Sequence, residues 1–120
     1  MRLGDKLKAM KPAESVITID GNKYRVVGLL ASKKADLLAL ARDKKGTFVS
    51  GKADGLFLSA CVRDEASGEP FFTEDEWDEW GSVPGSVTGP LMAECMRVCG
   101  VDNEDVGREV KNLDTTPSSV

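Results

Sequence analysis

The sequence predicts a mainly helical α+β fold, in which an N-terminal two-stranded β-hairpin precedes a compact bundle of four to five short helices. Two runs rich in β-branched residues on either side of Gly21-Asn22 indicate the hairpin. Apolar residues that recur at three- and four-residue spacing through the rest of the chain indicate the helices. The length of 120 residues suits one domain with a single modest core.

The predicted domain covers residues 15–113, with a flexible lead-in over 1–14 and a polar tail over 114–120. In the lead-in, apolar residues at helical spacing allow a short helix, which Pro12 would end. These residues are Leu3, Leu7 and Met10. The predicted helices of the domain cover about 32–43, 52–63, 74–80, 84–99 and 103–113.

The hairpin is expected to have strands over 15–20 and 23–27, joined by Gly21-Asn22 as a two-residue turn. Pairing outward from this turn places opposite charges together and gathers the apolar pairs on one face. The expected pairs are Asp20 with Lys23, Ile19 with Tyr24, Thr18 with Arg25, and Ile17 with Val26. A lone hairpin is marginal in water, so this one should pack on helices.

Two amphipathic helices are predicted after the hairpin. Ser32 is the expected N-cap of the first, whose apolar stripe consists of Leu30, Leu37, Leu38 and Ala41. The second, over 52–63, should be buried and central, because its apolar residues extend around most of the helix. They are Ala53, Leu56, Phe57, Leu58, Ala60, Cys61 and Val62. Gly55 weakens this helix by up to about 1 kcal/mol relative to Ala, so tertiary packing must hold it.

The second half of the chain contains a capping box, formed by Thr73 with Glu76, which opens a short acidic helix through Trp80. The next helix, over 84–99, contains Gly89-Pro90. It therefore either kinks there or begins near Pro90 with Thr88 as its cap. Asp102 is the expected cap of the last helix.

Composition and charge exclude several functions. The net charge of −4 argues against nucleic acid as a partner, and the chain has no apolar run long enough to span a membrane. Its N-terminus has no apolar signal segment, so we expect a cytosolic protein with reduced thiols. The chain lacks His, the commonest general base and metal ligand.

Two groups of residues could in principle hold a metal ion. Cys95 and Cys99 stand one helical turn apart, with Cys61 elsewhere, but without further ligands all three fit buried core positions better. The acidic segment that starts at Asp64 fails the calcium-loop pattern at positions 3, 5 and 12. We therefore predict no metal, no cofactor and no catalytic residues.

Four aromatic residues around the capping box are the candidate protein-binding residues. Phe71 and Phe72 precede the acidic helix, and Trp77 and Trp80 lie three residues apart on it. Tryptophan is enriched at interaction hot spots. The alternative is structural, because the short helix has no other large apolar residue that could attach it to the core. We expect one of the two tryptophans to pack inward and the other to lie at the rim.

Residues 62–76 (VRDEASGEPFFTEDE), followed by Trp80-Gly81 and by a helix that closes at Cys99-Gly100-Val101, carry a family resemblance. Together with the hairpin before them and the Ser/Thr-rich end after them, they resemble the small tail assembly chaperones of long-tailed bacteriophages. The resemblance covers most of the chain from about Ser15.

The resemblance implies a non-enzymatic protein of the host cytoplasm that binds the phage tape measure protein and recruits tail tube protein. Such a chaperone is not a usual component of the finished virion. The alternative is a structural virion component, such as a head–tail connector. A third class, a small hydrolase or metal-dependent enzyme, would need bound metal or carboxylates with perturbed pKa values. The sequence leaves self-association open.

Overall fold

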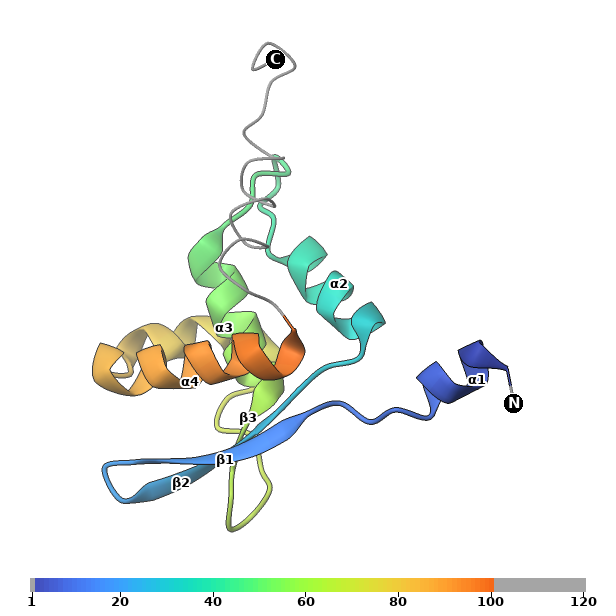
Figure 1. Cartoon of the computed structure of the whole chain (residues 1–120). Helices are drawn as coiled ribbons and strands as arrows, with labels where there is room; N and C mark the ends of the chain where they lie inside the picture. The colour runs from blue at the N-terminus through green and yellow to red at the C-terminus, as the bar shows by residue number, and fades with distance from the viewer. Residues whose placement is uncertain (1, 101–120) are drawn as a thin grey trace, which may run out of the picture.

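The computed structural model describes residues 2–100 of the chain. Within them it confirms the predicted α+β fold, with a hairpin at the N-terminal side and helices after it (Figure 1). The predicted last helix over 103–113, its cap Asp102 and the tail over 114–120 lie outside the described residues. The elements are α1 (Leu3–Lys8), β1 (Glu14–Ile19), β2 (Asn22–Val27), α2 (Ala31–Leu40), α3 (Ser50–Cys61), β3 (Val62–Asp64), η1 (Glu74–Ser82, a 3₁₀ helix) and α4 (Gly85–Cys99).

The sheet has a third strand that the sequence did not predict. Its order is β1-β2-β3, and both pairings are antiparallel. Residues 62 and 63 were expected to continue the helix, but the chain leaves α3 at Cys61 and pairs with the free edge of β2. Val62 lies opposite Val26, and both side chains are fully buried. This pairing satisfies backbone groups that a single hairpin would leave open.

The predicted register of the hairpin is wrong by two residues. Ile17 pairs with Tyr24 and Ile19 with Asn22, so the two-residue turn is Asp20-Gly21. Both turn residues have positive φ, 51° and 82°, as in a type I′ turn, for which Asp-Gly is strongly favoured. The predicted Asp20–Lys23 pair does not form. The apolar face is unchanged, because the shift moves each partner by two residues.

Helix α2 begins and ends earlier than predicted. Leu30, and not Ser32, is its N-cap, and no side chain caps the helix. Leu30 is 62% exposed, so it leaves the predicted apolar stripe, whereas Leu37 and Ala41 are fully buried. The helix stops at Leu40 because Asp43 organises the next loop: its Oδ1 accepts the backbone N–H groups of Lys45 and Thr47.

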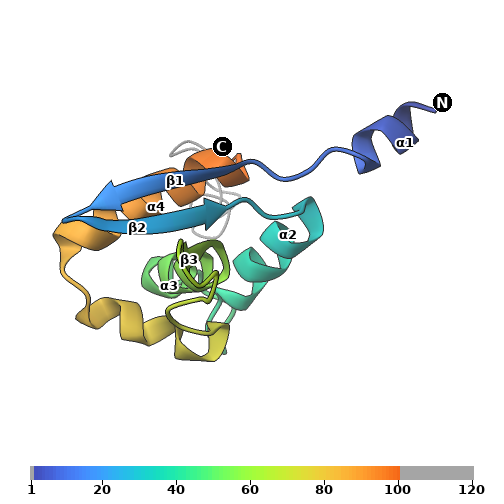
Figure 2. The same ribbon diagram turned by 90° about the horizontal axis from the view of Figure 1, so that it is seen from below.

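Helix α3 is the centre of the structure, as predicted, with α2 on one side and α4 crossing it on another (Figures 1 and 2). Its buried residues join two hydrophobic clusters. One cluster lies between α3, α4 and the sheet and includes Leu58, Leu91 and Val26. The other lies between α3 and α2 and includes Phe57 and Leu37. The hairpin therefore packs on helices, as expected.

Helix α4 runs from Gly85 to Cys99 with Pro90 inside it, so it does not begin at Pro90. Pro84 is its N-cap, and the carbonyl of Pro84 accepts the first backbone bonds of the helix, from Val87 and Thr88. The helix ends at Gly100, whose φ of 70° is left-handed, as predicted for a closing glycine.

Candidate functional site

The acidic segment between β3 and η1 forms a closed turn. The Asp64 N–H donates to the Glu69 carbonyl at 2.9 Å, and the Gly68 N–H donates to the Asp64 carbonyl at 2.7 Å. The Asp64 carboxylate accepts the Ser67 N–H at 3.0 Å. Glu65 pairs with Arg25 of β2 at 2.8 Å. These carboxylates therefore hold the turn together and attach it to the sheet.

The predicted capping box is present where η1 begins. The Thr73 N–H and the Thr73 hydroxyl both donate to the Glu76 carboxylate, each at 3.0 Å. These hydrogen bonds favour the ionised carboxylate and lower the pKa of Glu76. The backbone is non-helical at Glu76, so η1 is kinked there. The cap thus fixes the position from which the two tryptophans of η1 project.

Trp80, one of the candidate binding residues, is a buried core residue. Its side chain is 6% exposed, and its indole N–H donates to the Ser59 hydroxyl on α3 at 2.8 Å. Phe72 packs edge-on against its ring at a centroid distance of 5.1 Å. Trp80 therefore attaches η1 to the core, which is the inward role expected of one tryptophan.

Phe71 is the exposed member of this aromatic cluster. Its side chain is 44% exposed, and its ring lies 5.3 Å from that of Tyr24 and 6.5 Å from that of Trp80. Aromatic contacts at these centroid distances are favourable. Neighbours from the sheet and from η1 therefore hold the Phe71 ring in place while part of it faces solvent.

Trp77 packs against the hydrophobic cluster between α3 and α2, whereas Trp80 belongs to the cluster that includes the sheet. Trp77 is half-buried, and the Lys52 ammonium lies 5.8 Å from its ring centroid, a cation–π distance. The backbone of Trp77 passes so close to Gly55 that a Cβ at position 55 would lie 2.2 Å from the Trp77 carbonyl oxygen. Close approach of two helices thus explains the glycine in the middle of α3.

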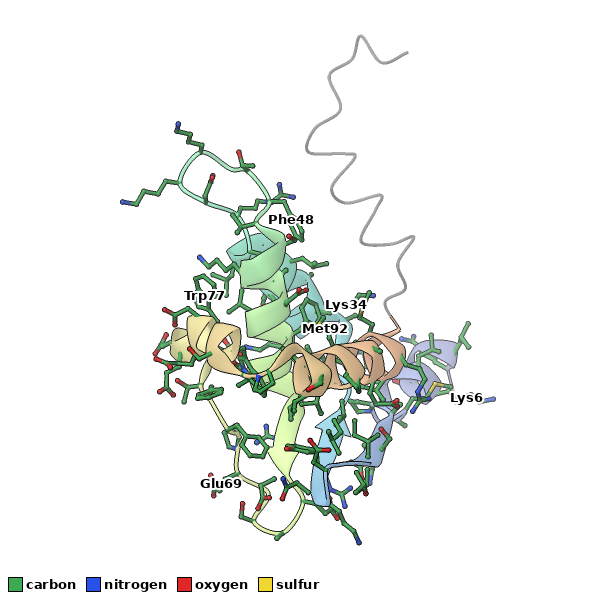
Figure 3. The ribbon with its side chains drawn as sticks, turned by 90° about the vertical axis from the view of Figure 1, so that its left-hand side faces the viewer. Lys6, Lys34, Phe48, Glu69, Trp77 and Met92 are labelled. Atoms are coloured by element: carbon green, nitrogen blue, oxygen red, sulfur yellow. The ribbon has the colours of Figure 1, made fainter. Side chains whose placement is uncertain are left out.

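A groove of about 570 Å³ lies between α3, η1 and the N-terminal half of α4. We call it the α3–η1–α4 groove. Leu58, Trp77 and Met92 supply apolar lining, and Figure 3 shows Trp77 on η1 and Met92 on α4. Glycines from all three helices also line it: Gly51, Gly55, Gly81 and Gly89. Gly55 is buried against η1, whereas the other three are exposed.

Two carboxylates, Asp54 and Asp78, complete the groove. The residue Asp54 is exposed, yet surrounding protein atoms partly desolvate its carboxylate and raise its pKa. Sequence reasoning missed the groove, because it is built from three segments that are distant in the chain. Of the four predicted binding residues, Trp77 and Trp80 line it, and Phe71 and Phe72 do not.

The three cysteines meet at the ends of α3 and α4. Cys61 and Cys95 are fully buried, which confirms their predicted core positions, and Cys99 is partly buried. The sulfurs of Cys61 and Cys99 lie 3.5 Å apart. The contact with Cys95 and burial together raise the pKa of the Cys61 thiol, and contact with Cys61 raises that of Cys99. Raised pKa values keep these thiols protonated and unreactive.

Within residues 2–100, no cluster of three or more Cys, Asp or Glu side chains has the geometry to hold a metal ion. None of the helices in this part of the chain combines the length and the apolar character needed to cross a membrane. Comparisons with models of protein families, with curated proteins and with solved structures give no match.

Proposed function

We propose that this chain is a non-enzymatic tail assembly chaperone of a long-tailed bacteriophage. In the host cytoplasm it would hold the tape measure protein and bring tail tube protein to it, without remaining in the finished virion. The family resemblance of the sequence motivates the proposal. The structural observation that supports it is the exposed, positioned aromatic ring of Phe71.

Phe71 lies within the segment that carries the resemblance, and that segment folds as one connected unit. The turn at Asp64–Glu69, the Thr73–Glu76 cap and the buried Trp80 together determine where Phe71 lies. Aromatic side chains dominate the binding energy of many protein interfaces. A ring already held by Tyr24 and Trp80 loses little conformational freedom on binding, which favours association.

The binding test uses the full chain with purified tail tube and tape measure proteins of the same phage. We expect the chain to bind at least one of them. Phe71→Ser should weaken that binding by about 30-fold, the effect of losing one hot-spot side chain worth about 2 kcal/mol. Leu30→Ser is the matched control, because Leu30 is also an exposed apolar residue and lies in a different segment.

The result distinguishes the proposal from its alternatives. Binding that Phe71→Ser weakens and Leu30→Ser does not would support a chaperone surface at Phe71. No binding to either protein would contradict the proposal. Mass spectrometry of purified virions separates the chaperone from a head–tail connector, because a connector would be present at a fixed copy number and a chaperone would be absent or sparse.

A further inference from the structure

The N-terminal arm, which we define as residues 2–11, has an apolar face that nothing in the described chain covers. Helix α1 has no buried residue. Leu3 and Leu7 are 72% and 54% exposed, and their spacing places them on one face of α1. Met10, which follows the helix, is 65% exposed. A helix this short is unstable in water unless its apolar face packs on another surface.

The arm and the α3–η1–α4 groove have opposite charge. The arm has four basic side chains and one acidic side chain, which gives a formal charge of +3. The groove presents Asp54 and Asp78, and η1 contains five acidic residues and no basic residue. Its apolar lining suits an apolar helical face, and its exposed glycines, Gly51, Gly81 and Gly89, allow a helix to approach closely. Apolar character and charge are therefore complementary between arm and groove.

The arm of a given copy is directed away from its own groove. Its base is fixed where the Gly28 N–H donates to the Ala13 carbonyl at 2.7 Å. Gly28 itself packs against the backbone of Val98, in the last turn of α4. The groove lies beside Thr88 and Gly89 near the other end, about 15 Å away along the helix axis at 1.5 Å per residue. Figures 1 and 2 both show α1 leading away from that end, and in Figure 3 Lys6 lies far from Trp77.

We propose that α1 of one copy docks in the α3–η1–α4 groove of a second copy of this chain. Leu3 and Leu7 would face the lining formed by Trp77 and Met92, and Lys6 and Lys8 would pair with Asp54 and Asp78. Reciprocal exchange of the two arms closes a dimer with two identical contacts. The proposal concerns self-association and does not depend on which client the chain binds.

The test measures the dimer dissociation constant of the full chain by sedimentation equilibrium at low salt. The arm variant, Lys6→Glu with Lys8→Glu, and the groove variant, Asp54→Lys with Asp78→Lys, should each raise it by at least about tenfold. The combined variant exchanges the two charges and should return it to within about threefold of the natural value. Leu3→Ser with Leu7→Ser should leave a monomer.

The matched control is Asp36→Lys with Glu69→Lys, which makes the same charge change at exposed positions outside the groove. It should leave the dissociation constant unchanged, and added salt should weaken the natural dimer because its ion pairs are screened. The proposal is overturned if the full chain is monomeric at millimolar concentration. It is equally overturned if a dimer forms that neither the arm nor the groove variant weakens, or if the combined variant fails to restore it. Circular dichroism confirms that each variant is folded.

Discussion

Replacing Gly55 with Ala tests the close approach of α3 and η1, because sequence and structure predict opposite signs. Alanine in a helix interior is normally more favourable than glycine by up to about 1 kcal/mol. By helix propensity alone, Gly55→Ala should therefore stabilise the protein. The structure predicts destabilisation, because the added Cβ would lie 2.2 Å from the Trp77 carbonyl oxygen and 2.9 Å from the carbonyl carbon.

The magnitude follows from the displacement required. Ordinary contacts of a Cβ lie at 3.4–4 Å, so η1 would have to move away by about 1 Å. That movement would disturb Trp80, which connects η1 to Ser59. Overpacking typically costs about 1–3 kcal/mol, which outweighs the gain in helix propensity. We expect a net loss of about 1 kcal/mol, or a fall in Tm of roughly 4 °C.

Gly51→Ala is the matched control in the same helix, because a Cβ at position 51 would meet no atom within 4 Å. It should be neutral or stabilising by a few tenths of a kcal/mol. Urea unfolding followed by tryptophan fluorescence and by circular dichroism gives both free energies of unfolding. If Gly55→Ala proves as stable as Gly51→Ala, the reasoning on the contact between α3 and η1 is refuted.

Three further predictions concern the core, a helix cap and acid stability. Trp80→Ala should lower the free energy of unfolding by about 3–5 kcal/mol and reduce the helical circular dichroism signal, because the Trp80 ring is buried. An unchanged signal with full stability would contradict the core role of Trp80. Leu30→Asp should raise the free energy of unfolding by about 0.5–1 kcal/mol, since the aspartate supplies the N-cap side chain that α2 lacks. Unfolding in urea measures this change, and a loss of stability would contradict the capping role. Glu94 accepts hydrogen bonds from Arg97 and Ser15, and these hydrogen bonds lower the pKa of its carboxyl group. The stabilisation by Glu94 is therefore fully present above its ordinary pKa, and it is lost as the pH falls through the lowered pKa. Glu94→Gln should therefore lose less stability than the natural chain between about pH 5 and pH 3, and an identical loss would show that Glu94 does not contribute.

Local patterns in the sequence were sufficient to predict the position of most helices and strands. The spacing of apolar residues located α3 and its burial, and Thr73 with Glu76 located the start of η1. The hairpin was located, but its register was not, because Asp20-Gly21 and Gly21-Asn22 are both acceptable turns. Since the two registers differ by two residues, they place the same side chains on the same face, and alternation does not distinguish them.

The features that sequence reasoning missed depend on contacts between distant segments. Strand β3 has only three residues and continues directly from an apolar helix, so its sequence does not distinguish it from the helix. It is defined by its pairing with the free edge of β2. By helix propensity alone Gly55 only destabilises α3, and the Trp77 backbone beside it is the reason that no side chain fits at this position. Which of the two tryptophans packs inward could not be predicted for the same reason, since the burial of Trp80 depends on its contact with Ser59 of α3.

Deletion of the gene, with electron microscopy of the lysate, tests the proposed chaperone role most directly. The proposed function predicts heads without normal tails, and restoration of tails when the natural chain is supplied from a plasmid. Phe71→Ser supplied in the same way should restore them poorly, whereas Leu30→Ser should restore them fully. Normal numbers of tails of normal length after deletion would contradict the proposed function.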